Sequence, residues 1–484
     1  MLPRSRHDGF PGEGRGSGDD LPLTPSPASS HGRRCGGVVR GASIRAERAG
    51  WLDTEQFSLF CTRGERGSGR TGLSINPIDS PSPFFTPERA NSPPPSSEMA
   101  PLLALLLCRL LLSALPCSAA ASPSRSSSPS VAPTPLVPAL FVIGDSTADV
   151  GTNNYLGTLA RADREPYGRD FDTHRPTGRF SNGRIPVDYL AEKLGLPFVP
   201  PYLEKSMRMG LGSVGLGNID GMIQGVNYAS AAAGILSSSG SELGMHVSLT
   251  QQVQQVEDTY EQLALALGEA ATVDLFKRSV FFVSIGSNDF IHYYLRNVSG
   301  VQMHYLPWEF NQLLVNAVRQ EIKNLYNINV RKIVLMGLPP VGCAPHFLSD
   351  YGSQNGECID YINNVVTEFN YGLRYMSSEF IRQYPDSMIS YCDTFEGSVD
   401  ILENRDRYGF LTTTDACCGL GKYGGLFICV LPQMACSDAS SHVWWDEFHP
   451  TDAVNRILAE NVWSGEHTKM CYPMDLQEMV KLKK

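Results

Sequence analysis

Short apolar runs recur along this chain, and longer stretches with helical periodicity separate them. The apolar runs lie at 139–143, 225–230, 280–285, 332–337 and 388–391. Few of them alternate polar and apolar residues, which is typical of strands that are buried on both faces of a parallel sheet. The helical stretches lie at 182–194, 249–267 (with Thr250 as a candidate N-cap), 307–326 and 359–384. This alternation predicts an α/β fold built from parallel βα units around one sheet.

Small and reactive residues follow three of these runs. Ser146 comes after the first run, separated from it only by Gly144 and Asp145. Gly234 ends a turn of small residues after the second run, and Asn288 follows the third. In an open α/β sheet, the loops at the carboxyl ends of the strands converge on one crevice. We therefore expect Ser146, Gly234 and Asn288 to lie close together.

Near the other end of the chain, Asp446 stands three residues before His449. With Ser146, these residues can supply the nucleophile, the general base and the orienting acid of a serine hydrolase. The backbone N–H groups of Ser146 and Gly234 and the side-chain amide of Asn288 would hold the oxyanion. Because Gly234 has no Cβ, its backbone can approach a substrate closely. The alternative for Ser146 and His449 is a structural role at the start of a helix.

The first 98 residues do not have the pattern of a folded domain. They contain twelve Arg, eleven acidic residues and no Lys, with many Gly, Ser and Pro and no apolar period. We interpret residues 1–98 as a disordered extension or as untranslated sequence before a start at Met99. We expect a signal peptide at 99–121 and a Ser/Pro-rich tether at 122–138 to follow. The folded domain is expected at 139–475 and a C-terminal tail at 476–484.

Eight cysteines lie in the expected domain, and an even number suggests disulfides in an exported protein. Cys343 and Cys358 would close one local loop. Four others occur together in a Gly-rich segment, namely Cys417, Cys418, Cys429 and Cys436. Zinc is the alternative for this group, although it contains no CxxC pair and no interleaved histidine.

Charge and short motifs indicate which partners and modifications the chain can have. From Met99 onward, 28 Lys and Arg oppose 39 Asp and Glu, which argues against nucleic acid as a partner. The apolar run at 102–115 is too short for a stable membrane span. Asn297 begins an Asn-Val-Ser sequon and is a candidate glycosylation site.

Several sequence blocks resemble those of the plant-type GDSL esterase/lipases, a family of the SGNH hydrolase superfamily. The main blocks are Gly144-Asp145-Ser146, Asn227-Tyr228-Ala229-Ser230 with Gly234, Gly286-Ser287-Asn288-Asp289, and Asp446-Glu447-Phe448-His449-Pro450-Thr451. Weaker ones include Pro166-Tyr167-Gly168 and Ala416-Cys417-Cys418-Gly419. Together they cover roughly residues 139–475.

This resemblance implies a flavodoxin-like three-layer sandwich with about five parallel strands. It also implies Ser146 as the nucleophile, Gly234 and Asn288 as oxyanion donors, Asp446 and His449 as the acid–base pair, and no metal or other cofactor. Thr147 departs from the family pattern, which has Leu there, and Ile143 replaces the usual Phe. No Gly-x-Ser-x-Gly elbow surrounds Ser146, so an α/β-hydrolase fold is not implied.

We expect a secreted serine esterase or lipase, located in the cell wall or apoplast, that hydrolyses lipid or small acyl esters through an acyl-enzyme on Ser146. Acyl transfer to an alcohol would use the same residues. A lipid- or glycan-binding protein without catalysis is a further alternative, with the aromatic segments 290–295 and 444–448 lining a groove. Residues 203–223 are expected to form a surface loop or a flap over the site.

Overall fold

The computed structural model describes residues 134–204 and 221–482, which belong to one compact unit. The expected extension at 1–98, the signal peptide at 99–121 and most of the tether lie outside the described residues. So does most of the loop expected at 203–223.

The main sheet has five strands in the order β1-β2-β3-β4-β7. Their bounds are Leu140–Gly144, Val280–Ser284, Lys332–Met336, Met388–Cys392 and Cys471–Tyr472. The first four strands are parallel to one another, and β7 runs antiparallel to β4. The α/β prediction is therefore confirmed, as a sheet that is mostly parallel and flanked by helices.

The run at 225–230 does not form the parallel strand that we expected. Asn227 makes only isolated parallel bridges, to Val142 of β1 and to Pro201. Gly225 has φ +127°, and a Cβ there would lie 1.9 Å from the carbonyl oxygen of Leu140. The segment nevertheless runs along the edge of β1, since Tyr228 and Ser230 donate their N–H groups to the carbonyls of Val142 and Gly144 at 2.7 and 3.1 Å. It is not a regular strand of the sheet, and β7 supplies the fifth strand.

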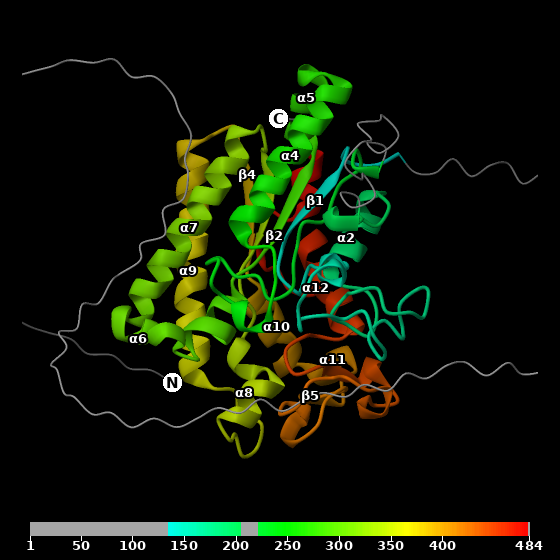
Figure 1. Cartoon of the computed structure of the whole chain (residues 1–484), viewed down its shortest axis with the longest axis vertical. Helices are drawn as coiled ribbons and strands as arrows, with labels where there is room; N and C mark the ends of the chain where they lie inside the picture. The colour runs from blue at the N-terminus through cyan, green and yellow to red at the C-terminus, as the bar shows by residue number, and fades with distance from the viewer. Residues whose placement is uncertain (1–133, 205–220, 483–484) are drawn as a thin grey trace, which may run out of the picture. The chain divides into compact units, whose positions relative to one another are not determined.

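Helices cover both faces of the sheet (Figure 1). The longest are α4, α7 and α9, at Leu249–Leu267, Pro307–Asn327 and Asp360–Gln383, and they pack beside one another. The helices α2, α10 and α12, at Pro186–Leu194, Thr394–Glu403 and Asp452–Ser464, form a second group. The shorter helices are α5, α6, α8, α11 and α13, at Glu269–Arg278, Val301–His304, Pro345–Asp350, Arg405–Tyr408 and Leu476–Lys481.

Two local predictions need correction. Helix α4 has the predicted bounds, but its N-cap is Ser248 rather than Thr250, because the Ser248 side chain accepts the N–H of Gln251 in a capping box. The expected tail at 476–484 contains helix α13, in which Leu476 and Met479 are almost fully buried. The folded domain therefore continues past residue 475.

The core is densest around β1, whose five residues are all buried. The ring of Phe141 stacks on that of Phe281 in β2, with 4.8 Å between centroids, and also lies 5.2 Å from Phe276. Continuous apolar strands of this kind are stable only when both faces are covered, as they are here. Buried aromatic packing thus fixes the strand that leads to Ser146.

All eight cysteines of the domain form disulfides. The predicted pair Cys343–Cys358 is confirmed, and the others are Cys392–Cys471, Cys417–Cys436 and Cys418–Cys429. The zinc alternative is wrong for the Gly-rich segment, because its four sulfurs are bonded in pairs and offer no thiolate. This segment lies beside a two-stranded sheet of β5, Thr412–Ala416, and β6, His442–Trp444.

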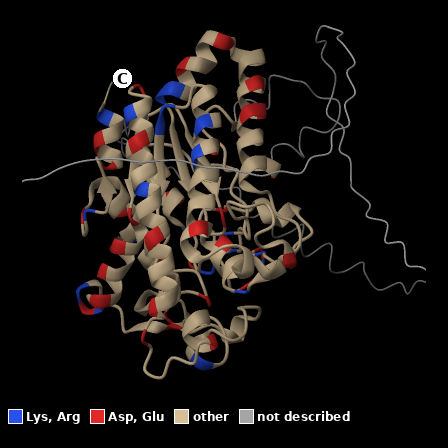
Figure 2. Ribbon diagram, turned by 90° about the vertical axis from the view of Figure 1, so that its left-hand side faces the viewer, with Lys and Arg blue, Asp and Glu red and all other residues tan. Residues whose placement is uncertain are grey.

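Acidic and basic residues are interspersed along the helices that face the viewer in Figure 2. Within the described part of the chain, none of the helices combines the length and apolar character that crossing a membrane requires.

Candidate active site

The end of β1 sets the position of Ser146. A Cβ at Gly144 would lie 2.5 Å from the carbonyl oxygen of Ser284, so a glycine is needed where β1 and β2 meet. The backbone of Gly144 is held by Gln252, whose side chain accepts its N–H at 2.8 Å and donates to its carbonyl at 2.9 Å. The chain then turns, and Asp149 donates its N–H to the carbonyl of Asp145. Ser146 consequently lies at the carboxyl edge of the sheet.

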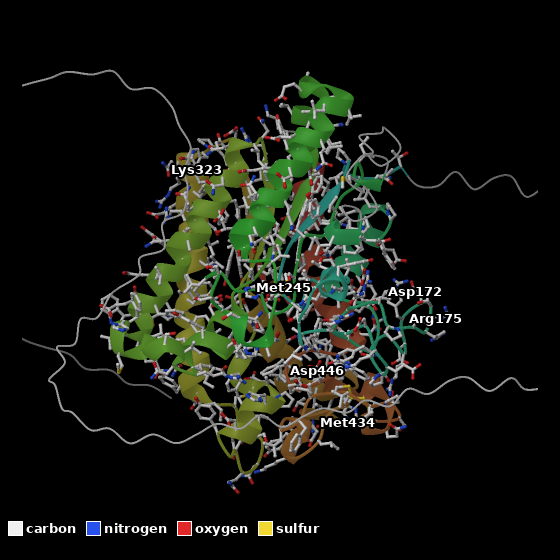
Figure 3. The ribbon with its side chains drawn as sticks, viewed as in Figure 1. Asp172, Arg175, Met245, Lys323, Met434 and Asp446 are labelled. Carbon is white, nitrogen blue, oxygen red and sulfur yellow. A yellow bond between two sulfur atoms is a disulfide. The ribbon has the colours of Figure 1, made fainter. Side chains whose placement is uncertain are left out.

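Ser146 and His449 are 303 positions apart in the sequence and meet at this edge. The distance between Ser146 Oγ and His449 Nε2 is 2.8 Å. On the other side of the imidazole, Nδ1 lies 2.8 and 3.0 Å from the two carboxylate oxygens of Asp446. Figure 3 shows Asp446 at the end of the domain where α8 and β5 lie. The structure thus brings the three predicted residues into one hydrogen-bonded chain.

A tight turn explains why three residues of spacing suffice for Asp446 and His449. The backbone N–H groups of Phe448 and His449 donate to Asp446 Oδ1 at 3.0 and 2.8 Å. The N–H of Trp445 donates to the carbonyl of His449 at 2.7 Å and closes the turn. Asp446 is 1% exposed, and Tyr167 donates its hydroxyl to Asp446 Oδ2 at 2.8 Å. The carboxylate is therefore fixed by four donors if the imidazole N–H is included.

The charges of this pair stabilise each other. Burial alone would raise the pKa of Asp446, but the nearby His449 and the donated hydrogen bonds outweigh burial and hold that pKa below its usual value. Burial alone would lower the pKa of His449, and the attraction of Asp446 outweighs it, so that this pKa is raised. The arrangement favours an imidazolium, which is the species formed when His449 takes a proton from Ser146.

Asn288 follows β2 at the carboxyl edge of the sheet. Its side-chain Nδ2 donates to the carbonyl of Ala233 at 2.9 Å, and the residue lines the same cavity as Ser146. A side-chain amide has two N–H donors, so one remains for a ligand. The next residue, Asp289, is fully buried and holds the neighbouring loop through hydrogen bonds from the N–H groups of Ile235 and Leu236, at 2.7 and 2.9 Å.

Gly234 is required for a reason that differs from the one we expected. A Cβ at this position would lie 2.5 Å from Cβ of Ser239 and 2.8 Å from Oδ2 of Asp289. The missing side chain therefore makes room for protein atoms on the inner side of the loop. Gly234 is not among the residues that line the cavity, whereas Ala231 and Ala232 are.

Sequence reasoning did not assign a role to Tyr167 or to Asp149. Asp149 accepts backbone N–H groups of Gly151 and Thr152, each at 2.7 Å, and of Ala231 at 3.1 Å. It is fully buried, and burial raises its pKa to about 6. Asp149 thus joins the loop after β1 to the loop that carries Gly234. The block that contains Tyr167 resembled the family, but nothing local to it pointed to Asp446.

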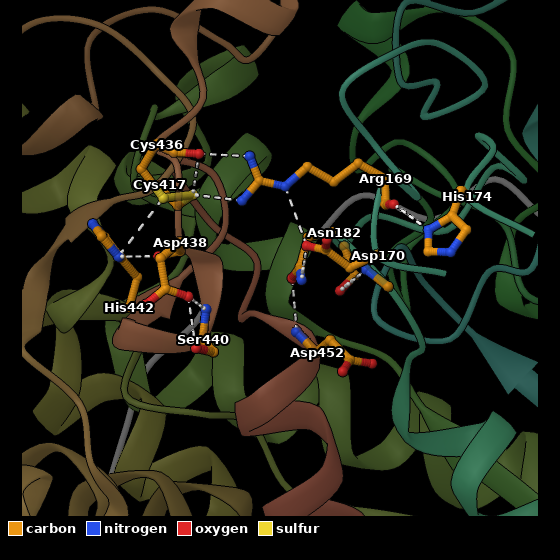
Figure 4. Close-up of polar contacts among 12 residues, drawn as sticks. Arg169, Asp170, His174, Asn182, Cys417, Cys436, Asp438, Ser440, His442 and Asp452 are labelled. Atoms are coloured by element: carbon orange, nitrogen blue, oxygen red, sulfur yellow. Dashed lines mark hydrogen bonds and ion pairs between the residues drawn. A yellow bond between two sulfur atoms is a disulfide. The ribbon is translucent and has the colours of Figure 1, made fainter. Parts of the chain in front are cut away.

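A polar network joins the loop that carries Tyr167 to the start of α12 (Figure 4). Arg169 donates to the carbonyl of Cys436 at 2.5 Å, and its guanidinium lies 5.1 Å from the centre of the Trp445 ring. Asn182 donates to Asp170 at 2.8 Å and accepts the N–H of Asp452 at 2.9 Å. These contacts fix both sides of the turn that holds His449.

Glu447 is a second acid at the site that sequence reasoning left without a role. It is 8% exposed and lines the cavity, and its Oε2 has no hydrogen-bond partner among the described residues. Burial and then the adjacent charge of Asp446 raise its pKa to about 8. This side chain is therefore mostly protonated at neutral pH.

Thr147, the departure from the family pattern, forms a polar contact that Leu could not form. Its hydroxyl donates to Asp145 Oδ1 at 2.8 Å and lies 3.1 Å from Oγ of Ser284. Asp145 is 2% exposed, and burial raises its pKa. Thr147 therefore helps to satisfy a buried acid directly beside Ser146.

The cavity at the site has a volume of about 420 Å³ and contains Ser146, Asn288 and His449 in its wall. Of the aromatic residues in the segments 290–295 and 444–448, Phe290 and Trp445 are fully buried in the core, whereas Trp444 and Phe448 line the cavity. Among residues 134–204 and 221–482, no cluster of three or more His, Cys, Asp or Glu side chains has an arrangement that could hold a metal ion.

Comparison with known proteins identifies the family. Residues 140–462 match the model of the GDSL-like lipase/acylhydrolase family. GDSL esterase/lipase 7 of Arabidopsis thaliana is 41% identical over 353 residues, which cover 72% of this chain and 93% of that protein. Two other GDSL esterase/lipases of the same plant are 38% and 37% identical and are matched over 90% and 86% of their lengths. The resemblance noted in the sequence is thus confirmed, and the chain belongs to the GDSL esterase/lipase family of carboxylic ester hydrolases.

Proposed function

We propose that this chain hydrolyses carboxylic esters through an acyl-enzyme on Ser146. The observation that carries the proposal is the hydrogen-bonded chain from Ser146 Oγ through His449 to Asp446, with distances of 2.8 Å at both of its links. Asp446 accepts the Nδ1 proton of His449, which leaves Nε2 free to accept the Ser146 proton. The raised pKa of His449 supports its role as the base.

In the first half of the reaction, Ser146 Oγ attacks the ester carbonyl carbon while His449 Nε2 takes its proton. The oxyanion accepts hydrogen bonds from the backbone N–H of Ser146 and from Nδ2 of Asn288. Gly234, which we expected as a third donor, does not line the cavity. The tetrahedral intermediate collapses, the C–O bond to the alcohol breaks, and His449 returns the proton to the leaving alcohol. Ser146 then carries the acyl group as an ester.

In the second half, water attacks the acyl-enzyme and His449 takes one of its protons. The second tetrahedral intermediate uses the same oxyanion donors, and its collapse releases the carboxylic acid and restores the Ser146 hydroxyl. An alcohol could replace water and give acyl transfer. We propose water as the acceptor, because the relatives are named as esterases and lipases.

We also propose that the protein is secreted and acts in the cell wall or apoplast. The four disulfides favour an oxidising compartment. Asn297 is exposed and begins its sequon in a turn, which supports glycosylation there. Export would depend on the signal peptide at 99–121, with translation from Met99.

Labelling with a fluorophosphonate tests the reaction mechanism. We expect protein expressed from Met99 to be labelled on the peptide that contains Ser146, with no label in Ser146→Ala. Three other serines, Ser284, Ser287 and Ser398, also line the cavity, so Ser287→Ala serves as a matched control that should keep its label on Ser146. A label on another residue, or none on folded protein, would overturn the proposal.

A further inference from the structure

The cavity extends well beyond the residues that carry out the proposed chemistry. From Ser146 and His449 it continues between the sheet and two helices, α10 and α12. The wall on the sheet side includes Phe282 of β2 and Met336 of β3, and the helical wall includes five apolar side chains, Ile401, Leu402, Val454, Leu458 and Val462. We call this inner part the chamber.

The strand register places the sheet side of the chamber on one face. Phe282 pairs with Val334, and Met336 stands two residues beyond Val334, so that Phe282 and Met336 point to the same side of the sheet. Met336 is 6% exposed and Leu458 is 7% exposed, whereas Val334 and Ala459 beside them are at 0%. The residual exposure of Met336 and Leu458 agrees with their position in the cavity wall.

The helical wall forms a continuous apolar row. Val454, Leu458 and Val462 are spaced four residues apart on α12 and therefore lie on one face of the helix. The row begins five residues after His449 and leads away from it. Its length is about 12 Å along the helix axis, which an extended chain of roughly nine or ten carbons would fill.

Charged residues line the opposite end of the same cavity. They are Arg161, Arg164 and Arg296. The side chains of Arg161 and Arg296 are 35% and 46% exposed, so this end faces solvent. The cavity thus has a polar, open end and an apolar, enclosed end, with Ser146 in its wall.

We propose that the chamber binds the acyl chain of the substrate and that the polar end receives the alcohol part. This inference rests on the proposed function of Ser146. It names the substrate class as esters of unbranched acyl chains of about nine or ten carbons, the length that the apolar row provides. Apolar walls favour this orientation, because burying methylene groups is favourable and burying an unpaired polar alcohol is not.

The chain-length profile of p-nitrophenyl esters tests the inference. For acetate, butyrate, octanoate, decanoate and palmitate, we expect kcat/KM to rise by up to about fourfold per added methylene until the chamber is full, and to rise no further for palmitate. A profile that is flat or highest for acetate would refute the binding of the acyl chain in the chamber and leave the proposed function intact. Absence of both hydrolysis and Ser146 labelling would instead overturn the proposed function.

Substitutions on α12 locate the chain within the chamber. In Leu458→Phe, the larger side chain occupies the row, and we expect the ratio of kcat/KM for decanoate to that for acetate to fall at least tenfold. Arg456→Phe introduces the same side chain on the exposed side of the same helix and should leave this ratio unchanged. If Leu458→Phe does not fold, Leu458→Ala carries the test, because it widens the chamber and should move the optimum to palmitate. An unchanged ratio in a folded Leu458 variant would refute the assignment.

Discussion

Glu447 should make the protein less stable as the pH rises, and Glu447→Gln should remove this effect. The carboxyl is 8% exposed, and burial followed by the charge of Asp446 raises its pKa from 4.5 to about 8. An acid with a raised pKa in the folded state keeps its proton there, while the unfolded chain releases it at lower pH. The contribution of Glu447 to the free energy of unfolding is therefore greatest below pH 4.5. It is lost as the pH rises from 4.5 through about 8.

The size of the effect follows from this pKa difference. Relative to acidic pH, the ionisation of Glu447 in the unfolded chain lowers the free energy of unfolding by about 3 kcal/mol at pH 7, since each pKa unit corresponds to about 1.4 kcal/mol. A glutamine keeps the shape and has no charge to desolvate. We therefore expect Glu447→Gln to raise the free energy of unfolding by about 3 kcal/mol at pH 7 and by little at pH 4.

Urea unfolding of the disulfide-intact protein at pH 4, 5.5, 7 and 8.5 measures this difference. Glu466→Gln is the matched control, because Glu466 is exposed and the substitution is the same. An equal difference between Glu447→Gln and wild type at all four pH values would refute the reasoning, since it would mean that Glu447 does not change its protonation on unfolding.

Three further substitutions test contacts around the site. Tyr167→Phe removes the donor to Asp446 Oδ2, and we expect kcat/KM to fall about tenfold, equivalent to about 1.4 kcal/mol. The acid limb of the pH profile of kcat/KM should move to higher pH, and an unchanged profile would contradict this role. Thr147→Val removes the hydroxyl donor to the buried Asp145 and should lower the free energy of unfolding by about 1–3 kcal/mol in urea titrations, whereas Thr147→Ser should retain most of the stability. Gly234→Ala would place a methyl group against Ser239 and Asp289. We expect it to lower kcat by about tenfold or more, because it displaces the loop whose residues Ala231 and Ala232 line the cavity, and a wild-type kcat would contradict this role.

The parallel strands could be predicted because their signal is local. The run at 332–337 is apolar after its first residue and lacks Gly and Pro before its last residue, and β3 occupies Lys332–Met336. β7 could not be predicted in this way, because it has only two residues, Cys471 and Tyr472, and depends on pairing with β4. The run at 225–230 has strand-like composition and does hydrogen-bond along β1, but its bridges stay isolated, and the positive φ of Gly225 beside Leu140 is a tertiary feature that the local sequence does not indicate.

In the site, too, the features that could be predicted are those encoded by neighbouring residues. The turn from Asp446 to His449 is encoded within a few residues, and the rule that strand ends converge brings Ser146 toward it. The contact of Tyr167 with Asp446 spans 279 positions, and no periodicity in the sequence indicates it. Burial of Glu447 also depends on tertiary packing, since an isolated Glu is most often exposed.

The central claim is that an acyl group is transferred to Ser146 during turnover, and mass spectrometry of the acid-quenched reaction tests it most directly. With p-nitrophenyl octanoate as the substrate, we expect the peptide that contains Ser146 to gain the mass of an octanoyl group in the first turnover, and this adduct should be absent in Ser146→Ala. Hydrolysis by Ser146→Ala at the wild-type rate, or an octanoyl adduct on a different residue, would contradict the account.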